Sequence, residues 1–141
     1  MSRIYWDSML FIYWLEGNPK FSERVRNLLE RSFRRKDQLF TSYLALGEIL
    51  AGAEKSPHPQ KASVIGQNLT EIGFSFLPFD GGSVAPFSRL RAVEKMKIAD
   101  SIHLACAASA GIDLFLTGDK QLLKLDVPGI QFIADFNTPI L

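Results

Sequence analysis

Residues 4–8 read Ile-Tyr-Trp-Asp-Ser, a run of three apolar, β-favouring residues that stops at a carboxylate and a hydroxyl. The next stretch, residues 9–16, suits a helix, and Gly17-Asn18-Pro19 closes it. A short strand followed at once by a helix is the beginning of a β–α unit. This first segment therefore predicts a sheet whose strands alternate with helices along the chain.

The same alternation continues to the end of the chain. Further short strands are predicted at residues 38–41, 74–79, 114–117 and 130–133. Helices are predicted at residues 21–36, 42–52, 60–72, 83–95 and 99–110, with a short one at 120–125. The sequence thus predicts a single α/β domain over residues 1–141, with a mainly parallel sheet flanked by helices.

Three helices carry patterns that set expectations for packing. In the second, Phe33 shares the helical spacing of the apolar residues Val25, Leu28 and Leu29. In the helix at 83–95, Pro86 is expected to lie in the first turn. The first helix is apolar in succession over residues 9–15 rather than along one stripe, which fits either burial within the domain or contact with another protein.

Composition limits the class of protein. The 141 residues are 47% hydrophobic and 22% charged, which excludes a disordered tail, a collagen-like chain and a coiled-coil rod. Lys and Arg number 16 against 15 Asp and Glu, and this net charge of +1 by itself argues against a strongly basic nucleic-acid-binding protein. Cys106 is the single cysteine, so we expect a reduced, cytoplasmic protein with neither a disulfide nor a structural zinc. No apolar run is long enough for a membrane span.

Four carboxylates stand out by their positions. Asp7 ends the first strand and Asp119 follows the strand at 114–117. Asp100 opens the helix at 99–110, and Glu48 lies in an otherwise apolar helix. Each also has a structural explanation: Asp100 as a helix cap, Asp7 and Asp119 as turn residues, and Glu48 on a solvated stripe. Functional groups in parallel sheets gather at the carboxyl ends of strands, so the four are also placed to converge.

Converging carboxylates would need a cation, because like charges crowded together cannot all stay ionised. Hard oxygen ligands select Mg²⁺ or Mn²⁺. Such an ion bridges phosphate oxygens and polarises a water for in-line attack. Phosphodiester hydrolysis is therefore the chemistry that this set of residues favours.

Four segments add a resemblance to this interpretation. They are Ile4-Tyr5-Trp6-Asp7-Ser8; Ser42 with Glu48-Ile49-Leu50-Ala51-Gly52; Ala99-Asp100-Ser101-Ile102-His103-Leu104-Ala105; and Leu116-Thr117-Gly118-Asp119. In order and separation they are similar to the motifs of the PIN-domain family, and most closely to its VapC-type toxin ribonucleases. The resemblance covers residues 4 to about 134. One departure is Met9, where the family often has Asn.

The resemblance implies a Rossmann-like parallel sheet with an acidic pocket formed by Asp7, Glu48, Asp100 and Asp119 as the metal-binding, catalytic set. It also implies an RNA substrate, an antitoxin protein that plugs the site, and a homodimer. A housekeeping RNA-processing nuclease and a catalytically inactive RNA-binding or scaffold domain remain as alternatives with the same motifs. A haloacid-dehalogenase-type phosphatase is the rival enzyme class, but it requires Asp-x-Asp where this chain has Asp7-Ser8-Met9.

Roles can be assigned within this hypothesis. Asp7 and Asp100 are expected to bind Mg²⁺ or Mn²⁺ directly, with Glu48 and Asp119 completing the pocket through water or a second metal. Ser8 and Thr117 are either hydrogen-bonding supports for carboxylate or phosphate, or plain cap and turn residues. His103 lies one helical turn after Asp100, so it either donates to a carboxylate or the metal site, or is a packed histidine.

Basic residues gather in residues 23–37 and 89–97, where each stretch could contact a phosphate backbone or form a solvated helix face. If four of the 15 acids form one pocket, 16 basic residues face 11 remaining acids, a balance of +5. The near-neutral total is therefore compatible with an RNA substrate.

Overall fold

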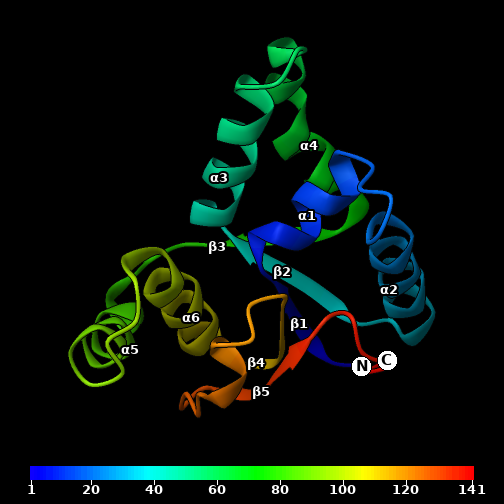
Figure 1. Cartoon of the computed structure of the whole chain (residues 1–141). Helices are drawn as coiled ribbons and strands as arrows, with labels where there is room; N and C mark the ends of the chain where they lie inside the picture. Colours follow the sequence, from blue (N-terminus) through cyan, green and yellow to red (C-terminus); the bar gives the residue numbers. More distant parts are fainter.

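The computed structural model describes all 141 residues and contains one sheet of five strands. Its strands are β1 (Arg3–Trp6), β2 (Gln38–Ser42), β3 (Phe74–Leu77), β4 (Ile112–Thr117) and β5 (Ile130–Asp135). They pair in the order β3-β2-β1-β4-β5, and every pairing is parallel. The first strand of the chain thus lies at the centre, between β2 and β4 (Figure 1).

Helices cover both faces of the sheet. They are α1 (Ser8–Leu15), α2 (Ser22–Arg35), α3 (Tyr43–Glu54), α4 (Ala62–Ile72), α5 (Gly81–Ala92) and α6 (Ile98–Ala110), with short 3₁₀ turns η1 (Pro59–Lys61) and η2 (Leu122–Lys124). Figure 1 shows α5 and α6 on one side of the sheet and α1 and α2 on the other, while α3 and α4 extend beyond it. The predicted α/β class with a parallel sheet and flanking helices is confirmed.

The alternation of β1 divides the core into two clusters. Ile4 and Trp6 point to the cluster under α1, α2 and α3, whereas Tyr5 points to the cluster under α5 and α6. All three side chains are fully buried, as expected for a central strand covered on both faces. Tyr5 stacks on Phe115 of β4, with ring centroids 4.8 Å apart. This face of β1 is where the hydroxyl of Tyr5 enters the polar network described below.

Local capping explains where several helices begin and end. The Ser42 hydroxyl accepts a hydrogen bond from the Ala45 N–H at 3.1 Å and starts α3 directly after β2. Asp80 and Ser83 form a capping box at the start of α5. Gly111 ends α6 in the left-handed conformation, with φ +70°, and leads into β4.

Some local predictions were wrong. Phe33 is 49% exposed, and Ser32 takes the buried position on α2 instead. Pro86 lies in the interior of α5, because that helix begins at Gly81 rather than at residue 83. Residues 120–125 contain only the 3₁₀ turn η2 instead of a short helix.

No helix in the structure is both long and apolar enough to cross a bilayer.

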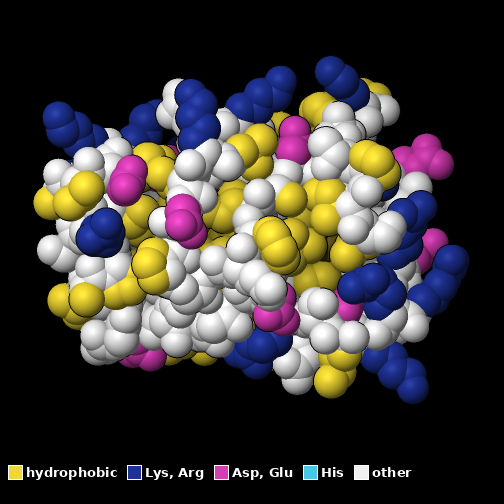
Figure 2. Space-filling model, turned by 90° about the horizontal axis from the view of Figure 1, so that it is seen from below, with side chains coloured by type: hydrophobic (Ala, Val, Ile, Leu, Met, Phe, Trp, Pro, Cys, Tyr) yellow, Lys and Arg dark blue, Asp and Glu magenta, His cyan; other side chains and the backbone are white.

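The apolar first helix is mostly buried within the chain itself. Leu10 and Phe11 are fully buried, and Ile12, Tyr13 and Trp14 pack against the core as partly buried side chains. Seen from the side of β5 and the chain ends, hydrophobic side chains gather in the middle of the surface and no histidine is visible (Figure 2).

Candidate active site

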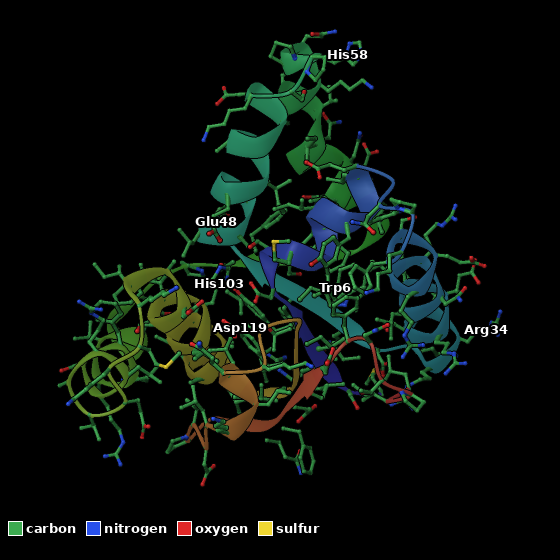
Figure 3. All side chains as sticks on the ribbon, viewed as in Figure 1. Trp6, Arg34, Glu48, His58, His103 and Asp119 are labelled. Atoms are coloured by element: carbon green, nitrogen blue, oxygen red, sulfur yellow. The ribbon has the colours of Figure 1, made fainter.

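The predicted site residues come from four different elements. Asp7 directly follows β1, and Asp119 lies two residues past the end of the neighbouring strand β4. Asp100 is in the first turn of α6 and Glu48 lies on α3. Because the strands are parallel, β1 and β4 end at the same edge of the sheet, where α3 and α6 also begin. Figure 3 shows Glu48, His103 and Asp119 along a path from α3, past α6, to the end of β4.

Asp7 is held on both carboxylate oxygens. Its Oδ1 accepts a hydrogen bond from the Ser8 N–H at 2.7 Å, which makes Asp7 the N-cap of α1. Its Oδ2 accepts from the Thr117 hydroxyl at 2.8 Å. The same Thr117 oxygen accepts from the Asp119 N–H at 3.1 Å. One buried hydroxyl on β4 therefore joins the two aspartate segments at the ends of β1 and β4.

The charges of the other two aspartates affect the pKa of Asp100. Burial raises the pKa of Asp100, and the negative charges of Asp119 and Asp7 raise it further. The nearby cation of Lys97 acts in the opposite direction on this pKa. Mutual repulsion at Asp100 is what close carboxylates produce when no cation offsets their charge.

Glu48 reaches the site through a histidine. His103 Nε2 lies 2.6 Å from Glu48 Oε1 and 3.7 Å from Asp7 Oδ1. The hydrogen bond with His103 lowers the pKa of Glu48, against the opposing effect of burial. Burial would lower the pKa of His103, but the bond to Glu48 and the charges of Asp7 and Asp100 outweigh it and raise that pKa. The histidine is therefore a buried donor between two of the predicted acids, rather than a merely packed ring.

The structure brings the four acids to one edge of the sheet but does not place them as a ready-made chelate. No three His, Cys, Asp or Glu side chains are arranged so that they could hold a metal ion as they stand. Two features still fit a hard divalent cation: the donors are carboxylates from four converging elements, and the charges of Asp119 and Asp7 add to the effect of burial in raising the pKa of Asp100. Asp7 and Asp100, the predicted direct ligands, both take part in that repulsion.

A family model of the PIN domain matches residues 4–128. The chain belongs to the PIN domain family. None of the curated proteins compared with the chain matches it.

Solved structures share the fold of this PIN domain. A chain in the crystal structure of DNA-bound VapBC from Salmonella typhimurium is similar over 96% of this chain and 99% of its own length, with 20% identity and a TM-score of 0.74. For VapBC2 from Rickettsia felis, bound to a DNA fragment from its promoter, the coverage is 94% and 98%, the identity 15% and the TM-score 0.73. For a toxin–antitoxin complex from Klebsiella pneumoniae the values are 92% and 95%, 19% and 0.65.

The two basic stretches of this PIN domain have different surroundings. In the first, on α2, Arg24 donates to the carbonyls of Phe136 and Thr138, and Arg31 donates to that of Leu141, so both hold the end of the chain. Figure 3 shows Arg34 of the same helix on the opposite side from Glu48 and His103. The second stretch contains Lys97, the cation next to Asp100. Of the basic residues in the two stretches, Lys97 is the one whose charge acts on the pKa of a predicted site residue.

Two residues of the site were not among its predicted members. Tyr5 contacts His103 through its hydroxyl, and Ser42 contacts that hydroxyl in turn. Ser42, which the sequence placed in the second family-like segment at the start of a helix, is the N-cap of α3. Tyr5 was expected only as a β-favouring residue, because the alternation of a strand says which face a side chain is on and not what it meets there.

Proposed function

We propose that this PIN domain is a metal-dependent endoribonuclease, and that it acts as the toxin of a toxin–antitoxin pair. The observation that carries the proposal is the convergence of Asp7, Glu48, Asp100 and Asp119 on one edge of a parallel sheet in a member of this family. The solved neighbours, which are VapBC and toxin–antitoxin complexes, support the choice of a toxin over a housekeeping nuclease.

Asp7 and Asp100 would hold Mg²⁺ or Mn²⁺, with Glu48 and Asp119 completing the coordination through water or a second ion. A bound divalent cation supplies an activated water and stabilises the charge that develops on the phosphate oxygens. It would also offset the repulsion that raises the pKa of Asp100. The carboxylate donors that such an ion requires come together at this edge of the sheet.

The protein's own groups orient these acids. Thr117 and the Ser8 N–H fix both oxygens of Asp7, so its carboxylate has one preferred direction. Lys97 places a positive charge beside Asp100 at the start of α6. We assign to Lys97 the role of attracting the phosphate backbone of RNA toward the acidic site.

The antitoxin partner is assigned to the apolar surface beside α1. Ile12 and Leu15 line a cavity of about 800 Å³ together with Ile49 of α3 and with Val64 and Ile65 of α4. Leu15 and Val64 are about half exposed. An amphipathic segment of an antitoxin would cover these side chains in the way that a helix fills an apolar groove. Leu15→Ser should weaken antitoxin binding, and unchanged binding would remove this surface from the proposal.

The decisive experiment is cleavage of mixed RNA by the purified chain with Mg²⁺ or Mn²⁺, with EDTA as the control. Asp7→Asn and Asp100→Asn should be folded and inactive. Cleavage at the wild-type rate by either variant would refute the site assignment, and cleavage that persists in EDTA would refute the metal. No cleavage by the wild type would favour the inactive RNA-binding alternative.

Two further assays address the partners. Lys97→Gln should weaken RNA binding and reduce its salt dependence, by about 0.7 in the log–log slope for each lost phosphate contact with a single strand. Arg34→Gln is the matched control, because Arg34 is an exposed residue of α2 far from the site. Molecular mass in solution tests the proposed homodimer, and a small antitoxin gene beside this one would separate a toxin from a housekeeping nuclease.

A further inference from the structure

A chain of hydrogen bonds leaves α3 at its cap Ser42, passes through Tyr5 and His103, and returns to the same helix at Glu48. The Ser42 hydroxyl lies 2.8 Å from the Tyr5 hydroxyl, which lies 2.7 Å from His103 Nδ1. On the other side of the ring, His103 Nε2 lies 2.6 Å from Glu48 Oε1. Tyr5 and Ser42 are fully buried and His103 is 2% exposed, so water does not compete for the contacts among these three, whereas Glu48 is partly exposed. The chain links β1, α6 and α3, three elements that are distant in sequence.

Counting hydrogens fixes the direction of the last bond. The Ser42 oxygen already accepts from the Ala45 N–H. With a neutral imidazole, Ser42 donates to Tyr5, Tyr5 donates to Nδ1, and Nε2 carries the hydrogen that goes to Glu48. With an imidazolium, Nδ1 donates to Tyr5, Tyr5 donates to Ser42, and Nε2 again donates to Glu48. In both arrangements Nε2–H is the donor, because two acceptors would repel each other at 2.6 Å.

The contrast among the acids shows why this bond matters. Asp7 is held by a backbone N–H and by Thr117, and Asp119 accepts a hydrogen bond from the Gln121 N–H at 2.9 Å. Glu48 lies on α3, and its main hydrogen bond is the one with His103 at 2.6 Å, with the Ser8 hydroxyl as a lesser partner. The same Nε2 is 3.7 Å from Asp7. The ring therefore stands between the carboxylate on α3 and the aspartate at the end of β1.

We propose that His103, itself oriented by Tyr5, is a positioning residue that fixes the direction of the Glu48 carboxylate toward Asp7. His103 acts through Glu48 and touches neither metal nor RNA. In metal sites, residues that hold a ligand in this way typically change metal affinity or activity by about 10–100-fold when they are lost. The effect on metal and RNA rests on the proposed function, whereas the orientation of Glu48 does not.

Two substitutions of His103 separate positioning from packing. In His103→Gln the side-chain amide reaches the place of Nε2 and keeps a donor for Glu48. In His103→Asn the shorter amide reaches only the place of Nδ1, so it keeps the contact with Tyr5 and loses Glu48. We expect His103→Gln to stay within about 3-fold of wild-type Mn²⁺ affinity and His103→Asn to lose about 10–100-fold. Equal losses in the two variants, or no loss in either, would overturn the positioning role.

The kinetics of RNA cleavage and the variant Tyr5→Phe give a second test of the positioning role. The loss in His103→Asn should appear in kcat, with KM for RNA unchanged, because the ring does not contact substrate. Tyr5→Phe removes the partner of Nδ1 and should fall between the two His103 variants. A change confined to KM would overturn the proposal, because it would place His103 in contact with RNA.

Nitrogen NMR of the imidazole tests the geometry without activity. His58 is the other histidine, is exposed and lies far from the site, so His58→Gln assigns the His103 signals and serves as the matched control (Figure 3). The Nε2–H signal should persist when Mg²⁺ is added, the Nδ1 signal should move in Tyr5→Phe, and the Glu48 carboxyl carbon should shift more in His103→Asn than in His103→Gln. Loss of the Nε2 hydrogen on adding Mg²⁺ would mean that the ring is a metal ligand and would overturn the proposal.

The same measurements distinguish the two proposals. A wild type that neither binds Mn²⁺ nor cleaves RNA would refute the nuclease. The carboxyl shift of Glu48 would still decide the positioning role: a larger shift in His103→Asn supports it, and equal shifts in the two variants overturn it.

Discussion

Thr117→Val tests the hydroxyl that joins the two aspartate segments. The substitution keeps the branched shape of a fully buried side chain but removes its oxygen. Two hydrogen bonds disappear with that oxygen: the one donated to Asp7 Oδ2 at 2.8 Å and the one accepted from the Asp119 N–H at 3.1 Å. The Asp7 carboxylate and the Asp119 N–H each lose this partner.

The expected cost follows from the type of each bond. A hydrogen bond to a charged acceptor contributes about 1.5–3 kcal/mol to stability and a neutral one about 0.5–1.5 kcal/mol. Thr117→Val should therefore reduce the free energy of unfolding by roughly 2–4 kcal/mol. Thr117→Ser is the matched control, since it keeps the hydroxyl and loses one methyl group, at a cost of about 1 kcal/mol.

Urea denaturation of the three proteins provides the measurement, with equal m-values required for the comparison. The expected order of stability is wild type, then Thr117→Ser, then Thr117→Val. Mn²⁺ affinity should fall in the valine variant and be largely kept in the serine variant, because only valine releases the Asp7 carboxylate. If Thr117→Val is as stable as the wild type or more stable than Thr117→Ser, the bridging role of this hydroxyl is refuted.

Three further predictions concern other parts of the chain. Burial raises the pKa of the Cys106 thiol to about 11, so a thiol reagent at pH 8 should label the native protein far more slowly than the urea-unfolded one; equal rates would contradict the buried position. Hydrogen bonds from two serine hydroxyls lower the pKa of Asp80, so its stabilising effect should be present at neutral pH and be lost as the pH falls through that lowered pKa. The stability difference between wild type and Asp80→Asn should therefore shrink in acid, and a difference that does not change with pH would count against it. Arg24→Ala should lower the free energy of unfolding by about 1–2 kcal/mol, because Arg24 binds two carbonyls near the chain end, whereas Arg34→Ala should stay within about 0.5 kcal/mol; the reverse order in urea denaturation would refute this.

The strands were predictable from the sequence, and so was the sheet edge at which Asp7 and Asp119 lie, because each depends on a local sequence pattern. Residues 4–6 and 114–117 are short apolar runs that stop at polar residues, and in a parallel sheet that is enough to place Asp7 and Asp119 near each other. Helix ends were less predictable where packing rather than capping decides them. Residues 120–125 have a helical composition but form only a 3₁₀ turn between two paired strands.

The sequence offered a carboxylate contact of His103 as one alternative, but it could not predict the partners of the ring. His103 is 55 residues from Glu48 and 98 from Tyr5, and their contacts depend on how α3 and α6 pack over β1. Phe33 shows the same limit in the core: its helical spacing is correct, but the neighbouring Ser32 is the one that faces inward. A periodic pattern assigns a face to within about one residue, and tertiary packing decides the rest.

The central place of β1 has a consequence for how the protein is made. Its flanking strand β4 carries Thr117, which is 110 residues away from the aspartate that it holds. At about 5–20 residues per second, a ribosome needs on the order of 5–20 s to add that stretch. Through this interval the nascent chain contains Asp7 but lacks the hydroxyl and the acid that adjoin it in the finished protein. The acidic edge is therefore assembled late in synthesis, so a growing chain carries no complete site until most of it has been translated.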